Sequence, residues 1–174
     1  MFALSSVAGN VCSTIFAGMR TVEEEMIASN VMTTDLITLG EDARVKDAIV
    51  LFQESALHDF PVIDGSGRPL GIVTARAVLH HAVPEYATDD LLAVMRGGPD
   101  IGSVYEMLAA SSQHRVIDVI DRQFPVVRQS MPTSAVAAML INLKGDSHNV
   151  LVVDDDGKLV GIISARDIIC RLPE

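Results

Sequence analysis

Apolar residues recur along this chain with two alternating periods. From residue 45 they fall at intervals of three and four, which is the spacing of one helix face: Val45, Ala48, Ile49 and Phe52. Two short apolar strands are predicted at 59–63 and 69–74, joined by a turn rich in Asp and Gly. Thr74 stands where its hydroxyl can cap a following helix. This stretch therefore predicts a helix, a hairpin and a second helix.

The same order of elements occurs twice. Residues 64–76 read DGSGRPLGIVTAR and residues 154–166 read DDDGKLVGIISAR, and six of these thirteen positions are identical at an offset of 90. The second copy also repeats the helical spacing: Val136, Met139, Leu140 and Leu143. Its strands are predicted at 149–153 and 159–164. Such a duplication indicates two α/β units in a pseudo-symmetric pair, with a cleft between them where a ligand can bind.

The repeat divides the chain into four parts. We expect a flexible N-terminal arm over 1–20, a first unit over 21–81, a helical connector over 82–118 and a second unit over 119–174. With the extended piece at 36–38, each unit reads β-α-β-β-α. The predicted fold class is α/β (α+β), with two pseudo-symmetric units packed sheet to sheet. A unit of this size buries only about 60% of its unfolded surface alone, which favours a shared core.

Composition adds an expected interface. The chain is 49% hydrophobic but has only five Phe, two Tyr and no Trp, so its core must be aliphatic. So much apolar surface in 174 residues predicts a homodimer, formed by the helices beginning near residues 43, 75, 135 and 165. A net charge of −10 disfavours a nucleic-acid partner, since phosphate contacts need clustered Lys and Arg.

Compartment and membrane contacts follow from the same sequence. Cys12 and Cys170 form no C-x-x-C motif and are interpreted as reduced thiols. The N-terminal stretch lacks the basic start of a signal peptide, and no segment approaches a transmembrane helix. We therefore expect a cytoplasmic protein that does not insert into a membrane.

The hairpins carry a recognisable motif. Residues 60–64 read FPVID and 71–74 read GIVT, while 150–154 read VLVVD and 161–167 read GIISARD. Over residues 30–80 and 119–172 this pattern resembles the cystathionine-β-synthase (CBS) domain. The resemblance implies a tandem pair, or Bateman module, that binds an adenosine-containing ligand and regulates a separate, unidentified protein. AMP, ATP and S-adenosylmethionine are the candidate ligands, and no cofactor is implied.

The resemblance makes Asp167 the carboxylate that accepts both ribose hydroxyls, with the Ser164 hydroxyl nearby. An ionised carboxylate suits this task because it accepts several hydrogen bonds at once. The alternative is that Ser164 and Asp167 form a capping box for their own helix, and the two roles can coexist. The remaining candidates in this site are a polar rim and an apolar slot for adenine: Arg166, His148, Val126, Val127, Val150, Leu151 and Ile163.

A weaker second site is expected in the first copy, because Ala77 stands where the second copy has Asp167. Its candidate residues are Thr74, Arg76, His58, Phe60, Pro61, Ile37 and Val73. Each has a structural alternative: the histidines can close backbone hydrogen bonds, the arginines can form surface ion pairs, and the apolar residues can belong to the core. Asp59 follows His58 where nucleotide-sensing relatives often carry Arg, which disfavours a polyphosphate.

Two other function classes remain as alternatives. A scaffold whose clefts are filled by side chains would have no need of Asp167. An enzyme is not expected, because the sequence has no P-loop and no Ser/His/Asp or Cys/His arrangement. His80, His81 and the distant His114 lack the spacing of a metal site, and residues 154–156 are interpreted as a solvated acidic turn.

Overall fold

The structure is a computed structural model that describes residues 26–83, 101–144 and 147–171. The expected arm over 1–20, and residues 84–100 of the expected connector, lie outside the described residues. The first unit contains β1 (Leu39–Gly40), α3 (Val45–Glu54), β2 (Asp59–Ile63), β3 (Pro69–Thr74) and α4 (Ala75–Ala82). The second contains β4 (Val126–Arg128), α7 (Thr133–Ile141), β5 (Asn149–Val153), β6 (Leu159–Ser164) and α8 (Ala165–Cys170). Helix α2 (Ala28–Val31) precedes the first unit, and helix α6 (Ile101–Ser111) with the 3-10 turn η1 (Val116–Asp118) precedes the second.

The strands form two three-stranded sheets, β1-β2-β3 and β4-β5-β6, each with one parallel and one antiparallel pairing. The antiparallel registers match at an offset of 90, because Asp59 lies opposite Thr74 and Asn149 lies opposite Ser164. Both hairpins also shift register at the equivalent place, after Val62 and after Val152. The predicted α/β class with two β-α-β-β-α units is confirmed.

Each hairpin turn is built by one aspartate and one glycine. Asp64 Oδ1 accepts hydrogen bonds from the backbone N–H groups of Ser66 and Arg68, at 2.8 and 2.9 Å. Gly67 has a φ of 84°, a left-handed conformation that side chains rarely adopt. In the second copy Asp154 and Gly157 repeat this arrangement, with a φ of 81° at the glycine. The repeated D-x-x-G pattern therefore specifies the same turn twice.

Each unit has its own aliphatic core, and each core receives a segment from the other half of the chain. Helix α2 precedes the first unit, yet Ala28 and Val31 are buried in the second core beside Val136 and Ile163. The 3-10 turn η1 precedes the second unit, yet Val116 is buried in the first core. The sequence repeat does not reveal this exchange, because the entering segments show little similarity to each other.

The exchange continues along the backbone after each entering segment. Thr33 forms an antiparallel bridge with Ile162 of β6, and Asp121 forms the equivalent bridge with Ile72 of β3. Strand β1 therefore begins only at Leu39, later than the extended piece expected at 36–38, since residues 33–38 first cross from the second unit to the first. These two equivalent bridges each join a segment from one half of the sequence to a strand of the other half.

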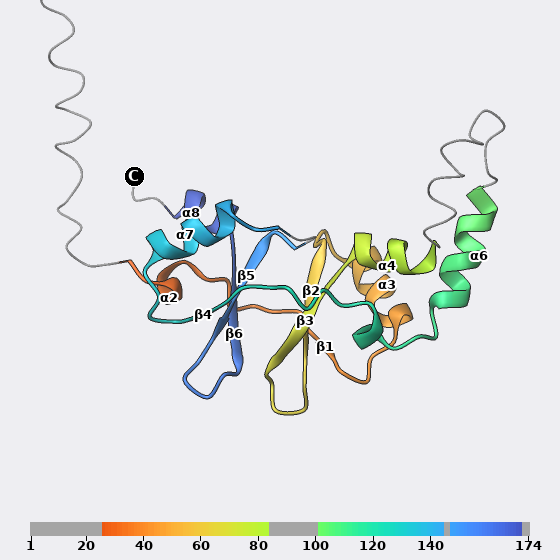
Figure 1. Cartoon of the computed structure of the whole chain (residues 1–174), viewed down its shortest axis with the longest axis horizontal. Coiled ribbons are helices and arrows are strands. Elements are labelled where there is room, and N and C mark those ends of the chain that lie inside the picture. The colour runs from red at the N-terminus through yellow and green to blue at the C-terminus, as the bar shows by residue number, and fades with distance from the viewer. Residues whose placement is uncertain (1–25, 84–100, 145–146, 172–174) are drawn as a thin grey trace, which may run out of the picture.

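The helices gather at one end of the strands. Figure 1 shows α3, α4, α7 and α8 on one side, with the tips of the two hairpins at the opposite end. Within the described ranges, no helix is both long and apolar enough to cross a membrane.

Candidate ligand-binding site

The Asp167 carboxylate lies at the start of α8 and is held by its own helix. The backbone N–H of Ser164 donates to Asp167 Oδ2 at 2.7 Å, and the Ser164 hydroxyl donates to the same oxygen at 2.6 Å. The Asp167 N–H donates in turn to Ser164 Oγ at 3.3 Å. The capping box that the sequence allows is therefore formed.

The other oxygen of this carboxylate faces a second segment of the chain. Thr33 Oγ1 donates to Asp167 Oδ1 at 3.1 Å, across 134 residues of sequence. The contact exists because residue 33 is bridged to Ile162, which lies near the end of β6 and shortly before α8. Thr33 is thus a site residue that the sequence reasoning missed. The residues around Thr33 in the sequence do not indicate this role, because Thr33 and Asp167 meet only through the packing of α2 in the second core.

The equivalent place in the first unit carries no such carboxylate. Thr74 is buried and caps α4 by accepting from the Ala77 N–H at 3.0 Å, but Ala77 contributes only a methyl group. Asp121, which occupies the position of Thr33, turns its Oδ1 to the N–H of Gln123 at 2.8 Å. The donor and acceptor pair of the second unit is therefore absent from the first.

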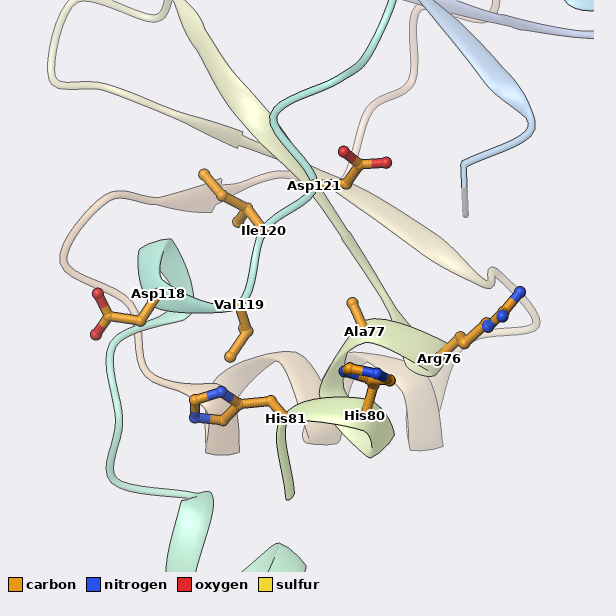
Figure 2. Close-up of a pocket in the computed structure, with 8 residues that line it drawn as sticks. All are labelled: Arg76, Ala77, His80, His81, Asp118, Val119, Ile120 and Asp121. Atoms are coloured by element: carbon orange, nitrogen blue, oxygen red, sulfur yellow. The ribbon is translucent and has the colours of Figure 1, made fainter. Parts of the chain in front are cut away.

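A cavity of about 380 Å³ lies at this first-unit position. Figure 2 shows helix α4 on one side of it and the segment after η1 on the other. Its lining combines basic, acidic and apolar side chains: Arg76, Ala77, His80, His81, Asp118, Val119, Ile120 and Asp121. Of the residues predicted for the weaker second site, Arg76 alone belongs to this lining, so the second site stays a prediction.

The side chains of His80, His81 and His114 are all exposed. His81 Nε2 lies 2.8 Å from His114 Nδ1, so the fold joins two rings that are far apart in the sequence. His58 and His148 are both exposed, as are Arg76 and Arg166. The His58 carbonyl accepts from the Ala75 N–H at 3.2 Å. Among the described residues no three His, Cys, Asp or Glu side chains cluster as metal ligands do.

Most of the apolar candidates lie in the two cores. Val127, Val150 and Ile163 pack in the second core, and Phe60 and Val73 pack in the first. Leu151 and Pro61 are buried too, on strand positions that alternate with the core-facing ones. Val126 and Ile37 are the exceptions, each 42% exposed. Core packing accounts for the buried residues, which leaves the polar group around Asp167 as the main feature of the site.

Comparison with known proteins agrees with this architecture. The family model of the CBS domain matches residues 28–83 and 116–174. An uncharacterised protein of Methanocaldococcus jannaschii is 25% identical over 157 residues, covering 84% of this chain and 90% of that protein. An inosine-5′-monophosphate dehydrogenase of Thermoplasma acidophilum is 24% identical over 153 residues, covering 81% of this chain but only 31% of the enzyme. The match to that enzyme is partial, whereas the match to the uncharacterised protein covers most of both chains.

Solved structures show the same fold. The CBS-pair protein CBSX2 of Arabidopsis thaliana superposes with a TM-score of 0.63 at 23% identity, over 83% of this chain and 92% of that one. The structure of CBSX2 in complex with AMP superposes with a TM-score of 0.59 at 25% identity, over 83% of this chain and 93% of that one. The complex with AMP is a property of CBSX2, a protein with the same arrangement of two units.

Proposed function

The chain belongs to the CBS-domain family as a tandem pair, and from this premise we propose that it is a regulatory module that binds an adenosine-containing ligand beside Asp167. CBS-pair proteins are regulatory, and a structural relative carries AMP. On this proposal the ligand changes how the module acts on a separate protein. AMP, ATP and S-adenosylmethionine are the ligands to compare first.

The single observation that carries this proposal is the Asp167 carboxylate, which accepts hydrogen bonds from residues of both halves of the sequence. Its two oxygens accept from Ser164 of the second unit and from Thr33 of the segment entering the first. A ribose presents two adjacent hydroxyls, and a carboxylate has about four acceptor positions for such donors. A ligand held here would contact both halves at once, and could therefore alter how they sit together.

The two clefts are proposed to differ in affinity. The first-unit cavity lacks a carboxylate at Ala77 and has Asp118 and Asp121 in its lining instead. Hydrogen bonds to a charged group contribute about 1.5–3 kcal/mol each, or about ten- to a hundredfold in affinity. We therefore expect the Asp167 site to fill first, with Arg166 and His148 at its exposed rim.

We further propose that the module acts as a homodimer through its helical face. Val50 and Ile141 occupy equivalent positions on α3 and α7, and both are exposed, by 45% and 82%. Leu79 and Ile169 are equivalent on α4 and α8, and are exposed by 47% and 66%. Apolar side chains exposed at matching places in both repeats indicate one continuous surface for a second copy. An adenosine ligand and the free thiol of Cys170 both suit the cytoplasm, which is the proposed compartment.

A non-binding scaffold is the second candidate, and one observation favours it. The Asp167 carboxylate already satisfies three donors without a ligand. A thermal-shift panel with the three ligands separates the two functions. A ligand at a hundred times its Kd adds about 2.7 kcal/mol, which raises the Tm of a domain this size by several degrees. A shift in the wild type that is absent in Asp167→Ala supports binding at this site, and no shift with any ligand supports the scaffold.

A further inference from the structure

Two equivalent residues of the repeat touch each other directly. Asp59 begins β2 and Asn149 begins β5, at the constant offset of 90. Asn149 Nδ2 donates to Asp59 Oδ2 at 2.6 Å, and the hydroxyl of the buried Ser147 donates to the same oxygen at 3.4 Å. Both members of the pair are partly buried. Because an ionised carboxylate can only accept, the amide nitrogen must be the group that faces it.

A contact between equivalent residues lies on the pseudo-two-fold axis that relates the repeats. The rest of the interface is reciprocal around that axis. A Cβ built on Gly67 would lie 3.8 Å from Lys158 Cγ, and one built on Gly157 would lie 3.8 Å from Arg68 Nε. The glycines are identical and the basic residues similar in both repeats, so these side-chain contacts do not distinguish one combination of units from another. The Asp59–Asn149 contact is different, because its two sides are chemically unlike.

From this asymmetry we propose that Asp59 and Asn149 determine which units pair. Two first units would bring two carboxylates together at the axis, partly shielded from water, where like charges repel strongly. Two second units would bring two amides together and lose the charge-assisted hydrogen bond. Only the pairing of a first unit with a second unit places the amide donor of Asn149 against the ionised carboxylate of Asp59.

The hairpin tips oppose the same wrong pairing. The Leu159 N–H donates to the Gly67 carbonyl at 2.9 Å. The equivalent of Leu159 is Pro69, which has no N–H, so a pair of two first units would lose this bond as well. Both asymmetric contacts therefore disfavour the pairing of two first units.

Two single substitutions reproduce the like pairings inside the native architecture. Asn149→Asp places two carboxylates at the axis, and Asp59→Asn places two amides there. The double variant Asp59→Asn with Asn149→Asp restores an unlike pair with its direction reversed. Gln123→Glu serves as the charge control, because it adds the same negative charge at an exposed side chain. Thermal unfolding at low salt and pH 7 is measured for all four variants.

We expect Asn149→Asp to lower the Tm by several degrees and Asp59→Asn to lower it less, with little change in Gln123→Glu. The double variant should recover most of the loss seen in Asn149→Asp, because unlike groups meet again. Light scattering on each variant should show altered self-association only where like groups meet. The proposal is overturned if both single variants unfold with the wild type, or if the double variant loses the sum of the two single losses.

Discussion

The Thr33 hydroxyl donates to the Asp167 carboxylate at 3.1 Å. This bond joins the start of the segment 33–38, which crosses from the second unit to the first, to the last helix of the second unit. Helix α2 lies just before Thr33 and is buried in the second core. A ligand that takes hydrogen bonds from Asp167 would therefore act on a contact between halves. This is the physical basis on which ligand binding at this site could change the pairing of the two units.

Replacement of Asp167 tests the site against the helix cap. Asp167→Ala should weaken adenosine-ligand binding by at least about tenfold and also cost about 1 kcal/mol of stability through the lost cap. Asp167→Asn is the matched control, because its amide oxygen can still accept from Ser164 while the charge is gone. Calorimetry gives the affinity, and denaturation without ligand gives the stability. If Asp167→Ala binds the adenosine ligand with unchanged affinity, Ser164 and Asp167 serve only to cap α8.

Ala77→Asp should supply the missing carboxylate in the first unit. Its position is the third residue of α4, where an acid completes a capping box with Thr74, so stability should rise by up to about 1 kcal/mol. Calorimetric stoichiometry should move from one ligand toward two per chain. Ala77→Asn caps without the charge and should not add a binding event. An unaltered stoichiometry in Ala77→Asp would mean that Asp118 and Asp121 keep the ligand out of this cavity.

Charges on the helical face should prevent dimer formation. Ile141→Glu together with Ile169→Glu places two carboxylates on the most exposed apolar positions of that face, and light scattering at micromolar concentration should then report a monomer. Tyr105→Glu is the control, since Tyr105 is 67% exposed on α6 and not on the four helices of the face. A monomeric wild type would contradict the proposed interface.

Two equivalent glycines should tolerate alanine unequally. A Cβ at Gly71 would lie 2.7 Å from the backbone carbonyl of Asp121, which cannot move without breaking the bridge to Ile72. A Cβ at Gly161 would meet only side-chain atoms of Met32, of which the sulfur and Cγ can rotate away while Cβ, at 2.9 Å, needs a small shift of the backbone. Gly71→Ala should therefore cost about 1–3 kcal/mol in chemical denaturation, and Gly161→Ala clearly less. Equal losses would show that the two entering segments are equally rigid.

Acid should weaken the first hairpin turn. The backbone N–H groups of Arg68, Ser66 and Gly67, together with the Arg68 charge, hold the pKa of Asp64 below its ordinary value of 3.8. A folded-state pKa below the unfolded one means that the stabilisation is present above the unfolded value and is lost as the pH falls through the folded one. The Tm advantage of the wild type over Asp64→Asn should therefore shrink as the pH is lowered from about 5 to 3. A constant difference across that range would contradict the role of the charge.

The duplication and the bounds of the paired strands could be predicted from the amino-acid sequence alone. The strands at 59–63, 69–74, 149–153 and 159–164 lie where the apolar pattern predicts them, and Thr74 and Ser164 cap the helices that follow. These features could be predicted because they depend on neighbours in the chain: a D-x-x-G turn, a capping hydroxyl and an apolar period act over a few residues.

Which segments contact each other could not be predicted, because it depends on how the two units pack. Thr33 beside Asp167, His81 beside His114, and Asp59 against Asn149 are contacts over long separations in sequence. The contact of Thr33 with Asp167 results from the exchange of α2 and η1 between the cores. The contact of His81 with His114 results from the packing of α6 against α4. Asp59 contacts Asn149 because these equivalent residues lie at the pseudo-two-fold axis. Burial of the aliphatic faces determines how the units pack against each other. The polar side chains come together only as a result of this packing, so local sequence patterns carry no information about their contacts.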